Sequence, residues 1–264
     1  MRHELGLRVA SSVVLIPVVI AATLLGGIWF QLLVAVALTL GAFEWARVTR
    51  LPAPALALLA LTPAGVAFAF AFAGGLAALG LAALFAASAA VAAAGRRIWA
   101  GLGALYLSLP GVACLWLMAT VEDGTLLMIW LLVSVWATDC CAYMVGRGVG
   151  GSRLAPRISP GKTWSGLLGG VAGAALLSVL FATYLQLAAP AILAGVAALL
   201  ALVAQAGDLL KSAVKRHFGV KDFGRVIPGH GGVLDRIDGL MTAVPALALL
   251  VALTGLEQGP PGWR

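Results

Sequence analysis

Long apolar runs separated by short polar breaks make up almost the whole chain. A helix needs about 20 predominantly apolar residues to cross the hydrocarbon core of a membrane. The pattern therefore predicts an all-α fold, that of a polytopic integral membrane protein with about nine transmembrane helices. The nine candidate spans fall near residues 9–26, 28–46, 55–73, 76–94, 100–119, 125–145, 166–187, 190–208 and 239–256.

Composition and charge support this count, and the charges indicate which side of the membrane each loop faces. Of the 264 residues, 62% are hydrophobic and 10% are charged, which no soluble domain of this length would show. With nine spans and a cytoplasmic N-terminus, 16 of the 17 Lys and Arg residues fall on the cytoplasmic side and only Arg264 falls outside. The positive-inside rule predicts this asymmetry. The net charge of +7 thus belongs to one membrane face, and we expect no nucleic-acid partner.

Two polar windows interrupt the apolar pattern, both on the predicted cytoplasmic side. Residues 205–239 hold six of the 17 Lys and Arg residues and four of the ten acids, and residues 146–166 hold four basic residues and no acid. We expect residues 1–264 to form a single integral membrane domain. Within it, residues 98–264 would be catalytic, with cytoplasmic loops 146–166 and 209–238. Residues 1–97 would be a scaffold, with a homodimer contact left open.

The acids of residues 205–239 need a chemical reason, because carboxylates at the mouths of apolar helices are costly. If residues 205–217 continue a helix, Asp208, Ser212 and the pair Lys215 and Arg216 share one face. That face would carry an anionic ligand, a hydroxyl and two cations. A cytoplasmic loop that only obeys the positive-inside rule is the simpler interpretation, but it leaves the acids unexplained.

Asp235 and Asp238 follow a Gly-rich turn, Pro228 to Gly232, at the start of the last apolar run. Glycines let the backbone of such a turn approach a ligand closely. Carboxylate oxygens suit Mg²⁺, which binds one or two of them and completes its shell with substrate phosphates. Neighbouring Lys and Arg side chains would hold the remaining phosphate charge. The residues alone therefore predict a metal-dependent phosphate site at the membrane surface.

Asp139 is the one acid well inside an apolar run. With Tyr143 and Arg147 it is spaced i, i+4, i+8, so that the three form a polar stripe towards the cytoplasmic side. A structural Asp–Arg pair between helices explains the spacing equally well. Further along, Ser159, Lys162 and Thr163 precede a span whose positive N-terminal end favours phosphate; a solvated basic loop is the alternative.

The second apolar run ends in Phe43-Glu44-Trp45-Ala46-Arg47. An acid and a Trp at a helix end fit an interfacial belt, and Glu44 and Arg47 are spaced to pair. This string predicts little about chemistry.

The polar residues of the window 205–239 stand in an order that resembles the signature of the phosphatidate cytidylyltransferases (CDP-diacylglycerol synthases). The stretch 139–163 resembles the same family, and so does the string from Phe43 to Arg47. Two departures are visible: Ser165 stands where the family usually has Glu, and an Arg expected near residues 117–119 is missing. The matching stretches are Ser212-x-x-Lys215-Arg216, Lys221-Asp222, His230-Gly231-Gly232-x-x-Asp235-Arg236-x-Asp238, Asp139-x-x-x-Tyr143-x-x-Gly146-Arg147 and Ser159-Pro160-x-Lys162-Thr163.

The resemblance implies transfer of a cytidylyl group from CTP to phosphatidic acid, giving CDP-diacylglycerol and pyrophosphate for phospholipid biosynthesis. It places the active site at the cytoplasmic leaflet of a bacterial plasma membrane and implies Mg²⁺ as cofactor, with one or two ions left open. The implied metal ligands are Asp139, Asp208, Asp235 and Asp238. Implied catalytic residues are Asp208, Ser212, Lys215, Arg216, Asp235 and Arg236, and implied substrate contacts are Tyr143, Arg147, Ser159, Lys162, Thr163, Lys221 and His230. His230 is equally well a turn residue.

Other functions stay open. A CTP-dependent polyprenol kinase would use similar phosphate chemistry, whereas the acidic D-G-x-x-A-R motif of CDP-alcohol phosphotransferases is absent. An ion-coupled transporter would use Asp139 for coupling. Against a transporter, the polar residues gather at one predicted face instead of the membrane midplane, and no inverted repeat is visible.

Overall fold

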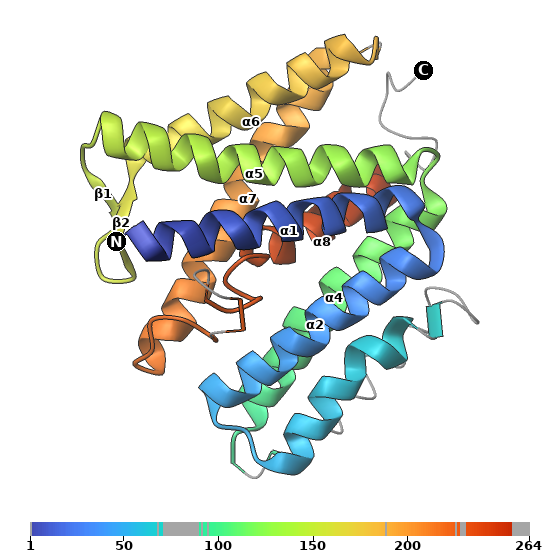
Figure 1. Cartoon of the computed structure of the whole chain (residues 1–264), viewed down its shortest axis with the longest axis vertical. Coiled ribbons are helices and arrows are strands. Elements are labelled where there is room, and N and C mark those ends of the chain that lie inside the picture. Colours follow the sequence, from blue (N-terminus) through green and yellow to red (C-terminus); the bar gives the residue numbers. More distant parts are fainter. Residues whose placement is uncertain are drawn as a thin grey trace. The chain divides into compact units, whose positions relative to one another are not determined.

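The computed structural model is helical in nearly all of the part it describes (Figure 1). It describes the chain apart from residues 1, 68, 71–89, 91, 94, 188, 225, 228–230 and 255–264, and side chains from Ser11 onward. The chain forms two compact units. The first contains Met1–Trp116 and His217–Ile237, and the second contains Leu117–Arg216 and Asp238–Arg264. We call residues 217–237 the return segment, because there the chain goes back to the first unit.

The first unit is built on helices α1 (Arg2–Leu25), α2 (Gly27–Thr49) and most of α4 (Arg97–Thr120), with a shorter helix at Ala53–Ala67. Gly26 and Gly27 make the turn between α1 and α2 with φ angles of 61° and 48°, which glycine adopts without a steric cost. Helices α2 and α4 approach closely where glycines face large side chains: a Cβ at Gly111 would lie 2.8 Å from Leu38 Cδ1.

The second unit contains α5 (Gly124–Gly148), α6 (Trp164–Tyr184), α7 (Pro190–His217) and α8 (Asp238–Thr254). Between α5 and α6 lies an antiparallel hairpin of β1 (Arg153–Ala155) and β2 (Ser159–Thr163). Figure 1 shows this hairpin at the end of α5, where α6 begins. Helices α5 and α6 pack along each other over much of their length.

In the sequence, Gly166, Gly169, Gly170 and Gly173 form a stripe of small residues, which predicts close helix packing, and the structure confirms it. A Cβ at Gly166 would lie 2.9 Å from the carbonyl oxygen of Ala142, and one at Gly170 would lie 2.8 Å from that of Thr138. Backbone can therefore meet backbone along the α5–α6 interface, as small residues permit in membrane helices.

The all-α prediction is confirmed in its main feature and corrected in one place, since the window 146–166 contains the β1–β2 hairpin. In their described residues, eight of the nine expected spans coincide with helices. The span expected at 76–94 falls almost wholly outside the described residues. Five of the described helices, α2 and α4 to α7, are long and apolar enough to cross a membrane, and three shorter apolar helices accompany them. The count of nine, the orientation and the homodimer contact stay predictions.

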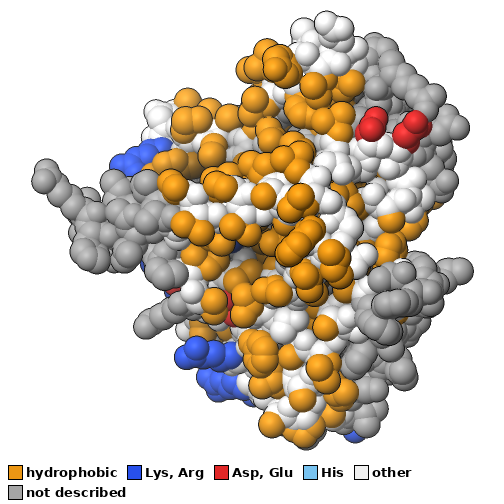
Figure 2. All heavy atoms as spheres, turned by 45° about the vertical axis from the view of Figure 1, so that its right-hand side comes forward, with side chains coloured by type: hydrophobic (Ala, Val, Ile, Leu, Met, Phe, Trp, Pro, Cys, Tyr) orange, Lys and Arg blue, Asp and Glu red, His pale blue; other side chains and the backbone are white. Residues whose placement is uncertain are grey.

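The surface of the described part matches a lipid environment. On the face drawn in Figure 2, hydrophobic side chains are spread over the described part, and charged side chains appear in only a few places. Large exposed side chains occur on several helices, including Leu105, Leu168, Leu180 and Leu199. In water such patches are rare on a monomer, whereas lipid tails cover them at no cost.

The glycine stripe generates a test with a built-in control. Gly170→Ala puts a methyl group against the Thr138 carbonyl, and we expect it to destabilise the protein by about 1–3 kcal/mol. Gly195→Ala, in α7, meets nothing within 4 Å and should be neutral or stabilising by up to about 1 kcal/mol. Thermal unfolding of both variants in detergent gives the comparison. Equal melting temperatures for the two variants would contradict the packing described here.

Candidate active site

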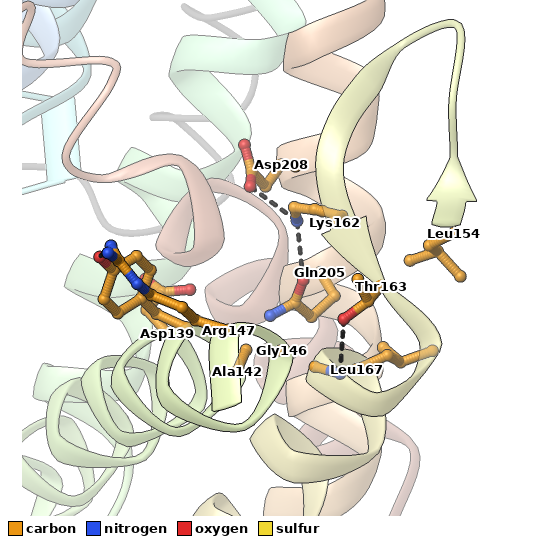
Figure 3. Close-up of a pocket in the computed structure, with 13 residues that line it drawn as sticks. Asp139, Ala142, Gly146, Arg147, Leu154, Lys162, Thr163, Leu167, Gln205 and Asp208 are labelled. Atoms are coloured by element: carbon orange, nitrogen blue, oxygen red, sulfur yellow. Dashed lines mark hydrogen bonds and ion pairs between the residues drawn. The ribbon is translucent and has the colours of Figure 1, made fainter. Parts of the chain in front are cut away.

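A pocket of about 560 Å³ opens within the second unit, between α5, the hairpin, the start of α6 and α7. The residues that line it include two carboxylates, an amide, a lysine and an arginine, and most of the others are apolar or glycine (Figure 3). The pocket therefore offers both a charged surface and an apolar surface. Its lining residues are Asp139, Ala142, Tyr143, Gly146, Arg147, Leu154, Gly161, Lys162, Thr163, Gly166, Leu167, Gln205 and Asp208.

The α5 side of the pocket carries the expected polar stripe. Asp139, Tyr143 and Arg147 all line the cavity, as their i, i+4, i+8 spacing predicts. Arg147 Nη1 donates a hydrogen bond of 2.8 Å to the Tyr143 hydroxyl, and its guanidinium lies 6.0 Å from the centre of the Tyr143 ring. The Arg147 partner that the structure records is thus Tyr143, which holds the guanidinium at the pocket.

Lys162 connects the hairpin to α7. Its ammonium donates to Gln205 Oε1 at 2.7 Å and forms an ion pair with Asp208 Oδ2 at 2.7 Å (Figure 3). Gln205 and Asp208 are three residues apart on α7 and so present one face to the pocket. The Lys162 side chain keeps 19% of its surface exposed, so this cation can reach a molecule that enters the pocket.

Lys211 extends the same row of charges into the protein. Only 3% of its side-chain surface is exposed, and its ammonium pairs with Asp238 Oδ2 and lies 3.8 Å from Asp208 Oδ1. Asp238 begins α8, and its Oδ1 accepts the backbone N–H of Gly239 at 2.8 Å. Each oxygen of Asp208 therefore faces a different lysine. Asp139 lies within electrostatic range of Asp208, Asp238 and both lysines.

The hairpin is held at the start of α6 by hydroxyl groups. Thr163 is the N-cap of α6, and its Oγ1 accepts the N–H of Gly166 at 3.0 Å. Ser165 donates to the carbonyl oxygen of Gly150 and lies 3.0 Å from the Thr163 hydroxyl. Ser165 thus closes the connection between α5 and the hairpin. Thr163 has a structural contact of its own, in addition to lining the pocket.

Comparison with known proteins places this chain in a family. The model of the family described as "Cytidylyltransferase family" matches residues 6–254 of the chain. The chain belongs to the cytidylyltransferase family.

Several curated relatives carry the name phosphatidate cytidylyltransferase. The protein from Brucella suis is 43% identical over 157 residues, which cover 60% of this chain and 58% of the relative. The Bacillus subtilis relative is 42% identical over 133 residues, covering 50% and 49%, and the Staphylococcus haemolyticus relative is 39% identical over 142 residues, covering 53% and 55%. The chain thus spans about half the length of the curated relatives it matches.

The first part of the cytidylyltransferase signature lies on the last turns of α7. The helix continues to His217, so Asp208, Ser212 and Lys215 follow each other along one side, as expected. Ser212 and Lys215 are half-buried and are not among the residues that line the pocket. Arg216 Nε donates to the carbonyl oxygen of Ile158 at 3.2 Å, which ties the end of α7 to the hairpin beside Ser159.

The second part of the signature, apart from Asp238, lies in the return segment and so belongs to the first unit. Asp235 is half-buried, and its Oδ2 accepts the backbone N–H groups of Phe223 at 2.9 Å and Gly232 at 3.3 Å. Lys221 and Arg236 are exposed. His230 lies outside the described residues. The roles expected for these four residues stay predictions.

The donor set of the pocket fits a magnesium ion without forming a complete cage. Among the described residues, no three His, Cys, Asp or Glu side chains converge as a ready metal site. Mg²⁺, however, needs only one or two carboxylates beside water and substrate phosphates. Asp139 and Asp208 come from different helices and line the same cavity. Asp238, which pairs with the buried Lys211, is not among the residues that line the cavity.

Sequence reasoning assigned no role to Gln205 and Lys211. Both are spaced three residues from Asp208, so the pattern Gln205, Asp208, Lys211 gives one helical face. That spacing could have identified them. What the sequence could not supply is the partner from another element, namely Lys162 for Gln205 and Asp238 for Lys211.

The burial of Lys211 generates a stability prediction. Lys211→Met leaves the carboxylates of Asp208 and Asp238 without their buried counter-charge, and we expect a loss of about 3–5 kcal/mol, measured as thermal unfolding in detergent. The double variant Lys211→Met with Asp238→Asn should regain part of that loss.

The control is Arg157→Met, which removes one exposed positive charge from the hairpin and should leave the melting temperature near that of the unsubstituted protein. If the Lys211 and Arg157 variants have the same melting temperature, Lys211 does not act as the buried counter-charge.

Proposed function

We propose that this chain is a membrane-embedded phosphatidate cytidylyltransferase that transfers the cytidylyl group of CTP to phosphatidic acid. The products would be CDP-diacylglycerol and pyrophosphate. One observation carries the proposal: in a member of the cytidylyltransferase family, a single pocket combines carboxylates from two helices with the exposed part of Lys162 and with an apolar wall. A phosphate-bearing lipid and a nucleotide triphosphate need both kinds of surface.

The reaction needs little covalent help from the protein. An oxygen of the phosphatidate phosphate would attack the α-phosphorus of CTP, a new P–O bond would form, and the bond from the α-phosphorus to the bridging oxygen would break. The electron pair leaves with pyrophosphate, and no proton has to move if phosphatidate reacts as the dianion. Catalysis then rests on positioning two anions and on stabilising charge, as in other phosphate transfers.

Bringing two anions together requires fixed cations, and the pocket supplies them. Lys162 is oriented towards the cavity by Asp208 and Gln205, and Arg147 is oriented by Tyr143. The two cations come from the hairpin and from α5, on different sides of the cavity (Figure 3). Such an arrangement suits a triphosphate on one cation and a lipid phosphate on the other, with Lys162 exchanging a carboxylate partner for a phosphate oxygen.

Mg²⁺ is part of the proposal, with Asp139 and Asp208 as its ligands in the pocket. The ion would supply charge neutralisation for the phosphates of CTP. Asp238 would act behind them by holding Lys211, and Lys211 in turn keeps the second oxygen of Asp208 in place. Asp235 stays a proposed Mg²⁺ ligand, and only its position in the signature supports this role.

The apolar side of the pocket supports lateral entry of the lipid. Ala142, Leu154 and Leu167 line it, and Trp164 and Leu168 are exposed beside it at the start of α6. Acyl chains could lie along such a surface while the phosphate reaches the polar wall. CTP would enter from the hairpin side, where Arg153 and Arg157 are exposed.

We also propose nine spans in the plasma membrane, with the N-terminus and both polar windows facing the cytoplasm. The charge asymmetry of the loops supports this. In a variant whose native cysteines are replaced, a cysteine at Ser152 should react with a membrane-impermeant maleimide only in inside-out vesicles, and a cysteine at Asp123 only in right-side-out vesicles. Reaction of both positions from the same side would refute the orientation.

The deciding experiment uses purified protein in detergent with phosphatidic acid, Mg²⁺ and CTP labelled at the α-phosphate. We expect a labelled lipid, release of pyrophosphate, and loss of both on addition of EDTA. Labelled CDP without a labelled lipid, obtained with a polyprenol in place of phosphatidate, would instead identify a lipid kinase. Neither product from a folded sample would refute the proposal.

Asp208→Asn tests the site itself. The amide keeps the size of the side chain but removes the charge that faces Lys162 and the proposed Mg²⁺, so turnover should fall at least about 100-fold. Glu122→Gln, which changes an exposed acid outside the pocket, should leave turnover unchanged. Initial rates of both variants, with thermal unfolding as a check on folding, decide the matter. Normal turnover in the Asp208 variant would remove this carboxylate from the mechanism.

A further inference from the structure

Glu44 is a buried carboxylate in a part of the chain expected to be a scaffold. It lies on the last turns of α2, and only 4% of its surface is exposed. Its Oε1 accepts the backbone N–H of Val233 at 2.8 Å and its Oε2 accepts that of Leu234 at 2.9 Å. These residues are separated by nearly 190 positions in the sequence but belong to the same compact unit. Burying a charge is costly, so the groups that compensate the Glu44 carboxylate indicate the role of this residue.

The two N–H groups stand at the beginning of a single helical turn. Arg236 N and Ile237 N both donate to the carbonyl oxygen of Val233, at 2.9 and 3.2 Å. The first N–H groups of such a turn have no partner within it and need a cap. A cap usually comes from the residue just before the turn, whereas here Glu44 provides it from another helix.

A second carboxylate completes the arrangement. Asp235 Oδ2 accepts the N–H of Gly232, so three consecutive N–H groups, from Gly232 to Leu234, all donate to acids of the protein. The sequence suggested that the backbone of this Gly-rich turn approaches a ligand. In the described part of this turn, Gly232 lies against the Glu44 carboxylate.

The glycines of the return segment fit this contact. A Cβ at Gly232 would lie 2.6 Å from Glu44 Oε2, and one at Gly224 would also collide with the Glu44 carboxylate. The neighbouring Trp45 stacks on Phe223, with ring centres 5.9 Å apart and an angle of 11° between the planes. Trp45 Nε1 in turn donates to the carbonyl oxygen of Trp99 at 2.9 Å, which fixes the indole. The end of α2 thus contacts the return segment at two places, at Phe223 and Gly224 and again at Gly232 to Leu234.

We propose that Glu44 is a positioning residue, which fixes the return segment so that Asp235 and Arg236 are presented in one orientation. The structural part of this proposal is independent of the reaction. Its consequence for turnover rests on the proposed function, in which Asp235 and Arg236 take part in phosphate transfer. Glu44 itself contacts backbone and is not assigned to the substrate.

Glu44→Gln tests the structural part. The amide can accept one of the two N–H groups but not both, because its nitrogen is a donor. Hydrogen exchange of the detergent-solubilised protein, followed by mass spectrometry, should therefore accelerate about 10-fold in peptides covering residues 231–237. The matched control is Thr49→Val, which removes another buried polar group from α2 whose hydrogen bond, to the Trp45 carbonyl, stays within the helix. Exchange at 231–237 should not change in the control.

Gly232→Ala perturbs the same contact from the other side. It should give the same local acceleration, and the double variant Glu44→Gln with Gly232→Ala should add little to either single change. Unchanged exchange at 231–237 in both single variants would overturn the proposal. Faster exchange spread evenly over α2 and α4 would overturn it too, because Glu44 would then be a general stability residue.

Kinetics test the consequence for the reaction. If the wild type makes CDP-diacylglycerol, Glu44→Gln should lower kcat by about 10-fold or more and raise the Mg²⁺ concentration needed for half the maximal rate. A variant that merely contained fewer folded molecules would show a lower maximal rate at an unchanged Mg²⁺ midpoint, which would contradict positioning. If the wild type shows no cytidylyl transfer, the proposed function fails while the exchange experiment still decides the role of Glu44.

Discussion

An alternating row of charges, Lys162, Asp208, Lys211 and Asp238, determines the arrangement of the second unit. Inside apolar helices an isolated charge is expensive, and removing one partner of a buried pair leaves the other uncompensated. The row therefore constrains every element that contributes to it. The hairpin has to bring Lys162 to α7, and α8 has to begin where Asp238 can reach Lys211. The pocket is the place where this row reaches an exposed surface.

Local spacing predicted a large part of this arrangement. The stripe Asp139, Tyr143, Arg147 lines one wall of the pocket, and the glycines at the start of α6 meet the α5 backbone. Both predictions depend only on the 3.6-residue period of a helix, which any long helix imposes on its residues. The positions of most helices follow from the lengths of the apolar runs in the same way. Continuation of α7 to His217 also followed, because no Gly or Pro interrupts residues 208–217.

The remainder depends on contacts between residues far apart in the sequence, which spacing does not encode. Glu44 has a plausible local partner in Arg47, and nothing near it in the chain indicates Val233. Residues 146–166 predict a cytoplasmic loop and not a hairpin, because the strands are only three and five residues long and β2 carries Gly and Pro. Ser165 looked like a departure from the family pattern. In the structure its hydroxyl contacts Gly150 and Thr163, which a sequence comparison alone does not reveal.

The contact between Glu44 and the two glycines of the return segment has a consequence for how this chain can be recombined with its relatives. Helix α2 lies in the first fifth of the chain, and Gly224 and Gly232 lie in the last fifth. A chimera whose junction lies between α2 and Gly224 takes the Glu44 carboxylate from one parent and the glycines that contact it from the other. Such hybrids should function only when the first parent keeps an acid at the position of Glu44 and the second parent keeps glycines at the positions of Gly224 and Gly232. The two ends of the chain thus form one unit of exchange, although Glu44 and Gly224 are 180 positions apart in the sequence.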